Sequence, residues 1–130
     1  MEPMSILLDT HVFVWALTDA RELKASTRRI IEGATRRFVS AASYWEIATK
    51  ARLGKWPNVE ACILSRDKLI RLGLTPLRLD LESAARAGRY DWEHRDPFDR
   101  ILVAQAERKN IPLVSYDQAL MQQAWARIIS

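Results

Sequence analysis

The stretch from His94 to Asp117, HRDPFDRILVAQAERKNIPLVSYD, constrains the fold more than any other part of the chain. An apolar helix pattern is followed directly by a short apolar strand pattern. Asp96 can cap the helix, and Pro97 suits its first turn, where a missing N–H breaks no hydrogen bond. The segment 111–115 is apolar and bounded by turn residues, which is typical of a buried strand in a parallel sheet. We therefore expect this strand to bring Asp117 to the carboxyl edge of that sheet.

The rest of the chain shows the same alternation of short strand patterns and helix patterns. Pro76 lies in one strand pattern and favours an edge position, because proline cannot donate to a strand ladder. The sequence predicts a three-layer α/β/α sandwich with a central, mainly parallel sheet, formed by residues 1–130 as a single domain. Further strands are expected at 5–8, 37–40, 74–79 and 127–129, and helices from about 11, at 25–34, from about 43 to 53, within 61–72, at 80–88 and at 118–125.

Composition limits the class of protein. The chain has 130 residues, 48% hydrophobic and 28% charged, as in an ordinary globular domain. Cys62 is the one cysteine, so an internal disulfide is impossible, and a reducing cytoplasm is the expected location. The N-terminal apolar run is broken by Asp9 and His11, unlike a signal peptide, and no stretch is long enough to span a bilayer. The formal net charge of +4 permits a polyanionic partner without establishing one.

Four acidic residues are candidates for a functional site, and Asp96 is an accessory candidate. Each has a purely structural explanation, as a helix cap, as part of a Ser43 to Glu46 capping box, or as an acid in the first helical turn. Taken singly, these explanations carry more weight than a functional one. The four residues are Asp9, Glu46, Asp99 and Asp117.

Taken together, the same acids indicate a metal site. In a parallel sheet, strand ends and the starts of the following helices share one edge, so distant acids can converge there. Two carboxylates about 5 Å apart repel by on the order of 3 kcal/mol at an effective dielectric constant of 20. A helix terminus stabilises an acid by only about 0.3 to 1 kcal/mol, so a divalent cation is needed. Oxygen ligands without cysteine or paired histidines favour Mg²⁺ or Mn²⁺, ions that commonly serve phosphodiester hydrolysis.

Four segments resemble, in order and spacing, PIN-domain proteins of the VapC type, the toxins of type II toxin-antitoxin modules. These segments are LLDTHVFVWAL, SAASYWEIATKARLGK, HRDPFDRILVAQA and IPLVSYD, and the resemblance covers nearly the whole chain. It implies a PIN-like fold and a Mg²⁺- or Mn²⁺-dependent endoribonuclease that cuts RNA. It also implies a VapB-like antitoxin partner and a homodimer.

The resemblance assigns the metal-binding and catalytic acids to Asp9, Glu46, Asp99 and Asp117. Asp99 matches because it directly precedes the RILVAQA helix, whereas Asp96 is a cap or an outer group that supports a ligand. Thr10 and Ser115 match polar positions near the metals of related domains. Their interpretation as cap and strand-end hydroxyls remains equally open.

Other residues carry weaker signals. His11 and His94 invite a general-base role, yet neither has metal-binding spacing or belongs to a triad, so both are expected to be surface or loop residues. Five basic residues can contact RNA phosphates, although two of them also suit a helix C-terminus: Lys50, Arg52, Lys55, Arg95 and Arg100. Five apolar residues are expected in the core by default, while the resemblance implies an antitoxin groove: Trp45, Leu53, Trp56, Ile63 and Leu64.

Three other functions compete with the ribonuclease hypothesis. A structure-specific DNA nuclease would use the same kind of metal site on a different substrate. A phosphotransfer enzyme with an aspartyl-phosphate intermediate is disfavoured, because Asp9 has no second carboxylate two residues further on. A non-catalytic partner-binding module would use the acids only as helix caps.

Overall fold

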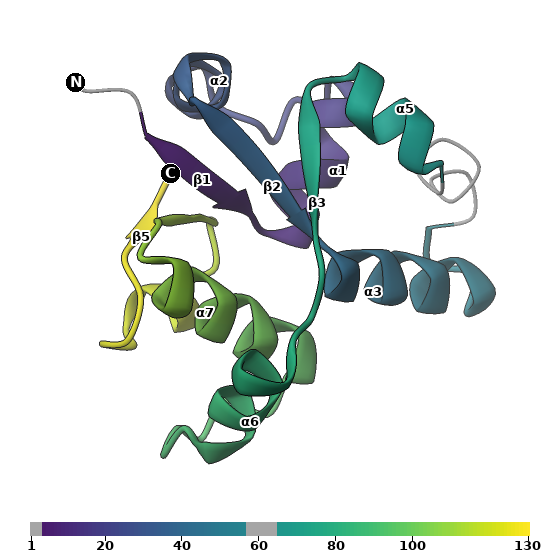
Figure 1. Ribbon diagram of the computed structural model, residues 1–130. Helices are drawn as coiled ribbons and strands as arrows, with labels where there is room; N and C mark the ends of the chain where they lie inside the picture. The colour runs from purple at the N-terminus through teal and green to yellow at the C-terminus, as the bar shows by residue number, and fades with distance from the viewer. Residues whose placement is uncertain (1–3, 57–64) are drawn as a thin grey trace.

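The computed structural model describes residues 4–56 and 65–130. Its centre is a sheet of five strands, all parallel, in the order β3-β2-β1-β4-β5 (Figure 1). The predicted central parallel sheet is therefore confirmed, and Pro76 lies on the edge strand as expected. The strands are β1 (Ser5–Leu8), β2 (Arg36–Ser40), β3 (Leu74–Leu77), β4 (Leu113–Val114) and β5 (Ile128–Ile129).

Helices cover both faces of the sheet, which gives the predicted three layers (Figure 1). Side chains alternate along β1, so that Ile6 and Leu8 pack into one core and Leu7 into the other. The first core also receives α1 and the second α7. The described helices are α1 (Thr10–Thr18), α2 (Ala25–Gly33), α3 (Ala41–Arg52), α5 (Arg66–Arg71), α6 (Leu81–Arg89), α7 (Pro97–Lys109) and α8 (Gln118–Met121).

The start of α3 differs from the prediction. Ser40, at the end of β2, is the N-cap, and its hydroxyl accepts the N–H of Ala42 at 3.0 Å. The predicted capping box is therefore wrong, because Ser43 and Glu46 both lie inside the helix. The extended backbone of Ser40 lets the strand pass directly into the helix, which leaves no loop for a cap at Ser43.

The C-terminal helix is shorter than predicted and ends at Met121. The side chain of Gln123 replaces helical hydrogen bonds, because its Oε1 accepts the N–H groups of Trp125 at 2.6 Å and Ala126 at 3.0 Å. Of the helix predicted within 61–72, the structure describes α5, and residues 61–64 lie outside the described part. None of the described helices is both long and apolar enough to cross a membrane.

Candidate metal centre

Two of the predicted acids follow the ends of adjacent strands. Leu8 of β1 pairs with Val114 of β4, and each strand is followed closely by an acid, Asp9 and Asp117 respectively. A cavity of about 290 Å³ lies at this edge of the sheet. All four acids expected from the sequence line it together with Asp96, and the full lining is Asp9, His11, Trp15, Glu46, Lys50, Asp96, Asp99, Tyr116 and Asp117.

Asp9 is held by the neighbouring strand. It occupies the N-cap position of α1, but its side chain makes no capping hydrogen bond, so its interpretation as a cap is wrong. Its Oδ2 instead accepts the hydroxyl of Ser115 at 2.5 Å, and the Ser115 oxygen accepts the N–H of Asp117 at 3.1 Å. Burial raises the pKa of Asp9, the Ser115 hydrogen bond and the charge of His11 oppose this, and the charge of Glu46 adds to the rise.

Glu46 reaches the cavity from the middle of α3 and is buried. One turn further on, the Nζ of Lys50 lies 3.0 Å from its Oε2 and also 4.4 Å from the centre of the Trp56 ring. Lys50 therefore balances the charge of Glu46 and forms part of the cavity wall.

Asp99 and Asp96 begin α7. Asp96 is the predicted cap, accepting the N–H of Phe98 at 2.9 Å, while Asp99 lies in the first turn and is buried. Burial raises the pKa of Asp99 to about 7; a hydrogen bond from His94 opposes the rise, and the charges of Asp96 and Asp9 add to it. Asp99 therefore lies in a pocket that disfavours its ionised form.

Asp117 combines both of its predicted roles. It caps α8 by accepting the N–H of Ala119 at 2.9 Å, and it also lines the cavity. Capping and a place in the site are thus compatible for this residue. Asp117 is exposed, so it supplies the solvent-facing side of the acidic group.

His94 is the site residue that sequence reasoning missed. Its Nε2 lies 2.8 Å from Oδ2 of Asp99. One ligand atom each from His94, Asp99 and Asp117 lie within 4.8 Å of one another. The sequence offered only one signal for this, its position five residues before Asp99, because no helical or strand period relates the two.

The donor set fits a divalent cation. Carboxylates that follow β1 and β4 share one small cavity with carboxylates from α3 and α7, and two of them, Asp9 and Asp99, have raised pKa values. Mutual repulsion and burial both penalise the ionised acids, and a bound cation relieves both penalties. Oxygen ligands of this kind suit a hard divalent ion such as Mg²⁺ or Mn²⁺.

The predicted accessory hydroxyls are buried. Thr10 donates its hydroxyl to that of Ser43 at 2.8 Å, which ties α1 to α3 beneath the cavity rather than capping a helix. Ser115 links Asp9 to Asp117, as described above.

The five predicted basic residues divide into different environments. Lys50 lines the acidic cavity, and Arg95 lines a neighbouring cavity of about 720 Å³ that also includes His94. Arg52 and Lys55 are exposed around the end of α3. Arg100 donates to four backbone carbonyls and so organises the loop before α7.

The predicted antitoxin groove is described in part. Trp45 and Leu53 on and after α3 are 57% and 55% exposed, so the expectation that they belong to the core is wrong for these two side chains. Trp56 is partly buried and packs against His11, with ring centres 5.1 Å apart. Ile63 and Leu64 lie outside the described residues.

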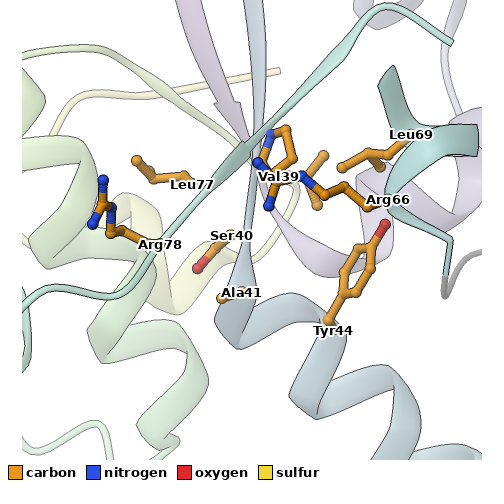
Figure 2. Close-up of a pocket in the computed structure, with 9 residues that line it drawn as sticks. Val39, Ser40, Ala41, Tyr44, Arg66, Leu69, Leu77 and Arg78 are labelled. Carbon is orange, nitrogen blue, oxygen red and sulfur yellow. The ribbon is translucent and has the colours of Figure 1, made fainter. Parts of the chain in front are cut away.

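A larger cavity, of about 670 Å³, lies between β3, α3 and α5 (Figure 2). Figure 2 shows Tyr44 rising into it from α3, with Arg66 coming from α5 and Arg78 from the chain after β3. Its described lining contains two arginines and no acid, so it does not have the ligands that a divalent cation needs. The acidic cavity is therefore the candidate metal centre.

Comparison with known proteins places the chain in a family. The family model of the PIN domain matches residues 6–125, so the chain belongs to the PIN domain family. DNA-bound VapBC from Salmonella typhimurium has the same fold, with a TM-score of 0.71 and 16% identity over 97% of both chains. No curated protein sequence matches the chain.

Two further solved structures share the fold at low identity. FitAcB from Neisseria gonorrhoeae is 19% identical over 96% of each chain, with a TM-score of 0.63. VapC20 from Mycobacterium tuberculosis, described as a sarcin-ricin loop cleaving toxin, is 16% identical, with a TM-score of 0.62. The match covers 93% of this chain and 96% of VapC20. At such identities these structures establish the shared fold.

Proposed function

We propose that this protein is a metal-dependent endoribonuclease and the toxin of a type II toxin-antitoxin module. One observation carries the proposal: four acids from distant parts of the sequence line a single cavity at the carboxyl edge of the sheet. Asp9, Glu46, Asp99 and Asp117 are the catalytic and metal-binding residues in this proposal, with Mg²⁺ or Mn²⁺ as the cofactor. A divalent ion held there supplies an activated water and stabilises the oxygens of the reacting phosphate.

The chain's own residues prepare the site for that chemistry. Ser115 donates a hydrogen bond to the carboxylate of Asp9 and accepts the N–H of Asp117, which fixes the positions of the two acids relative to each other. The Nζ of Lys50 lies 3.0 Å from Oε2 of Glu46 and lines the same cavity, where its ammonium group would attract a phosphate of a bound substrate.

RNA is the proposed substrate. The formal charge of +4 favours a polyanion, and the fold is shared with VapC20, a sarcin-ricin loop cleaving toxin. Lys50 and Arg95 are the proposed phosphate contacts nearest the acids, with exposed Arg52 and Lys55 as outer contacts. Arg100 is a weaker candidate, because its guanidinium already donates to four carbonyls.

The proposed partner is a VapB-like antitoxin. The fold is shared with VapBC from Salmonella typhimurium and with a chain of a toxin-antitoxin complex from Klebsiella pneumoniae. The exposed Trp45 and Leu53 offer apolar surface that an antitoxin segment would cover, and Trp56, Ile63 and Leu64 complete the proposed groove. The proposal further includes one domain over residues 1–130, a homodimer and a cytoplasmic location.

Asp9→Asn tests the function, because it removes one charge and keeps the size of the side chain. We expect Mn²⁺-dependent cleavage of a mixed RNA pool to fall at least about a hundredfold. The circular dichroism spectrum should remain that of the folded protein. Leu81→Ala, which changes an 86% exposed side chain on α6, is the matched control and should cleave normally.

The same assay separates the competing functions. Cleavage of single-stranded or flap DNA in preference to RNA would identify a DNA nuclease instead. Full RNA cleavage by Asp9→Asn would rule out a mechanism in which the Asp9 carboxylate binds the metal. Absence of both cleavage and Mn²⁺ binding by the unaltered chain would favour a non-catalytic partner-binding module.

A further inference from the structure

We propose that His94 is a direct imidazole ligand of the metal ion that Asp99 and Asp117 bind, and that this nitrogen makes the centre select a transition ion such as Mn²⁺ over Mg²⁺. This inference rests on the metal-dependent function proposed above and specifies which ion serves it.

The separation of the ligand atoms matches two neighbours on one ion. Nε2 of His94 lies 2.8 Å from Oδ2 of Asp99. In an octahedral site with metal–ligand distances of about 2.1 Å, adjacent ligand atoms are about 3 Å apart. The two atoms therefore already have the spacing of adjacent ligands, and the neutral ring with its proton on Nδ1 offers the lone pair of Nε2 to the ion. An atom of Asp117 lies within 4.8 Å of both, so a small rotation of this exposed side chain completes a three-ligand face.

One arginine holds the backbone of the loop that carries His94. Arg100 donates to the carbonyl oxygens of Tyr90 at 2.7 Å, Trp92 at 2.7 Å and His94 at 3.1 Å, and to that of Ala87 at 2.9 Å. The segment from 90 to 96 has no helical or strand hydrogen bonds of its own. These four bonds therefore hold the loop in the conformation that points His94 at the acids.

The plane of the imidazole ring is fixed as well. The indole of Trp92 stacks on it, with ring centres 4.7 Å apart and an angle of 28° between the planes. The Trp92 ring is itself packed against that of Trp125 at 5.8 Å. A ring held by stacking and a clamped backbone loses little entropy on binding a metal, as expected of a built ligand.

An imidazole ligand changes the choice of ion. Mg²⁺ prefers oxygen ligands and retains several waters, whereas first-row transition ions accept imidazole nitrogen readily. Removing the nitrogen should therefore weaken Mn²⁺ binding more than Mg²⁺ binding. For His94→Gln we expect Mn²⁺ affinity to fall about tenfold or more and Mg²⁺ affinity to change much less.

Pulsed electron paramagnetic resonance of the Mn²⁺-loaded full chain tests the bond itself. The chain contains two histidines, His94 and His11, and both lie near the acids. We expect the spectrum to show a coupled nitrogen nucleus that changes when histidine is labelled with ¹⁵N. The coupling should disappear in His94→Gln and remain in His11→Gln, the matched control.

Two results would overturn the inference. One is bound Mn²⁺ without a histidine nitrogen coupling, which would make His94 only a hydrogen-bond donor to a metal-bound Asp99. The other is a coupling that survives in His94→Gln. Either result leaves Mn²⁺ binding and RNA cleavage intact, so it is distinct from failure of the proposed function, in which no Mn²⁺ binds at all. The labelled unaltered chain gives its answer without any variant.

Discussion

At the scale of single residues, Asp99 shows how the acidic cavity lowers the free energy of unfolding. The residue is 8% exposed and lies beside the charges of Asp96 and Asp9, and these surroundings raise the pKa of its carboxyl group to about 7. The unfolded chain ionises the same group near 3.8. Between these two values the folded protein holds a proton that the unfolded protein releases, so the free energy of unfolding falls as pH rises from about 4 to 7.

Asp99→Asn removes this penalty. In EDTA we expect the variant to be more stable than the unaltered chain at pH 8, by on the order of 2 kcal/mol, and nearly equal to it at pH 4. Urea unfolding of both proteins at the two pH values measures the difference. An equal difference at both values would show that the ionised Asp99 is not the cause. The same variant should lose Mn²⁺ binding, a trade of function for stability.

At the scale of elements, the start of α3 decides how Glu46 is presented. Ser40 caps the helix through the N–H of Ala42, and the helix then carries Glu46 on its buried side toward the acids. We expect Ser40→Ala to lower the free energy of unfolding by about 1 kcal/mol, because a buried N–H loses its acceptor. Urea unfolding measures this.

Glu46→Ala is the matched comparison for that prediction. If the Ser43 to Glu46 capping box formed, Glu46→Ala would remove its acceptor and disturb the start of the helix. Since Glu46 lies within α3 instead, its replacement should leave the start of the helix unchanged in amide hydrogen exchange. Faster exchange at 41–43 in Glu46→Ala, with none in Ser40→Ala, would contradict the observed cap.

Much of this architecture follows from local patterns. The strand periods and the order of helices predict the parallel sheet, and the shared edge of parallel strands predicts that Asp9 and Asp117 approach each other. Asp99 follows for the same reason, since it opens the helix before β4. These features depend on apolar residues that recur every two residues in strands or every 3.6 residues in helices, and on the turn residues at strand ends. Both can be read directly from a sequence.

Other features depend on contacts that no local pattern encodes. The capping-box pattern at Ser43 was misleading because the strand runs straight into the helix at Ser40. His94 was missed because its direction is set by Arg100, which bonds to carbonyls of a loop without a period. The capping hydrogen bond predicted for Asp9 does not form, because the hydroxyl of Ser115, 106 residues away, donates to its carboxylate. Long-range side-chain bonds of this kind are decided only by the assembled fold.

At the scale of the whole molecule, the acidic cavity brings together parts of the chain that are far apart in the sequence. Its residues run from Asp9 to Asp117 and come from both cores' helices and from two adjacent strand ends. Without an ion, their like charges push these elements apart, and Lys50 compensates only Glu46. An ion that binds the folded state alone therefore acts as a cross-link between α1, α3 and α7.

The resulting prediction concerns global stability. Mn²⁺ at about a hundred times its dissociation constant should raise the free energy of unfolding by about 2.7 kcal/mol, because it binds the folded chain and not the unfolded one. Urea unfolding with Mn²⁺ and with EDTA gives the difference. Asp9→Asn should lose most of the gain and Leu81→Ala should keep it, since only the first removes a carboxylate from the cavity. Identical unfolding curves with Mn²⁺ and with EDTA would mean that the four acids share a cavity without sharing an ion.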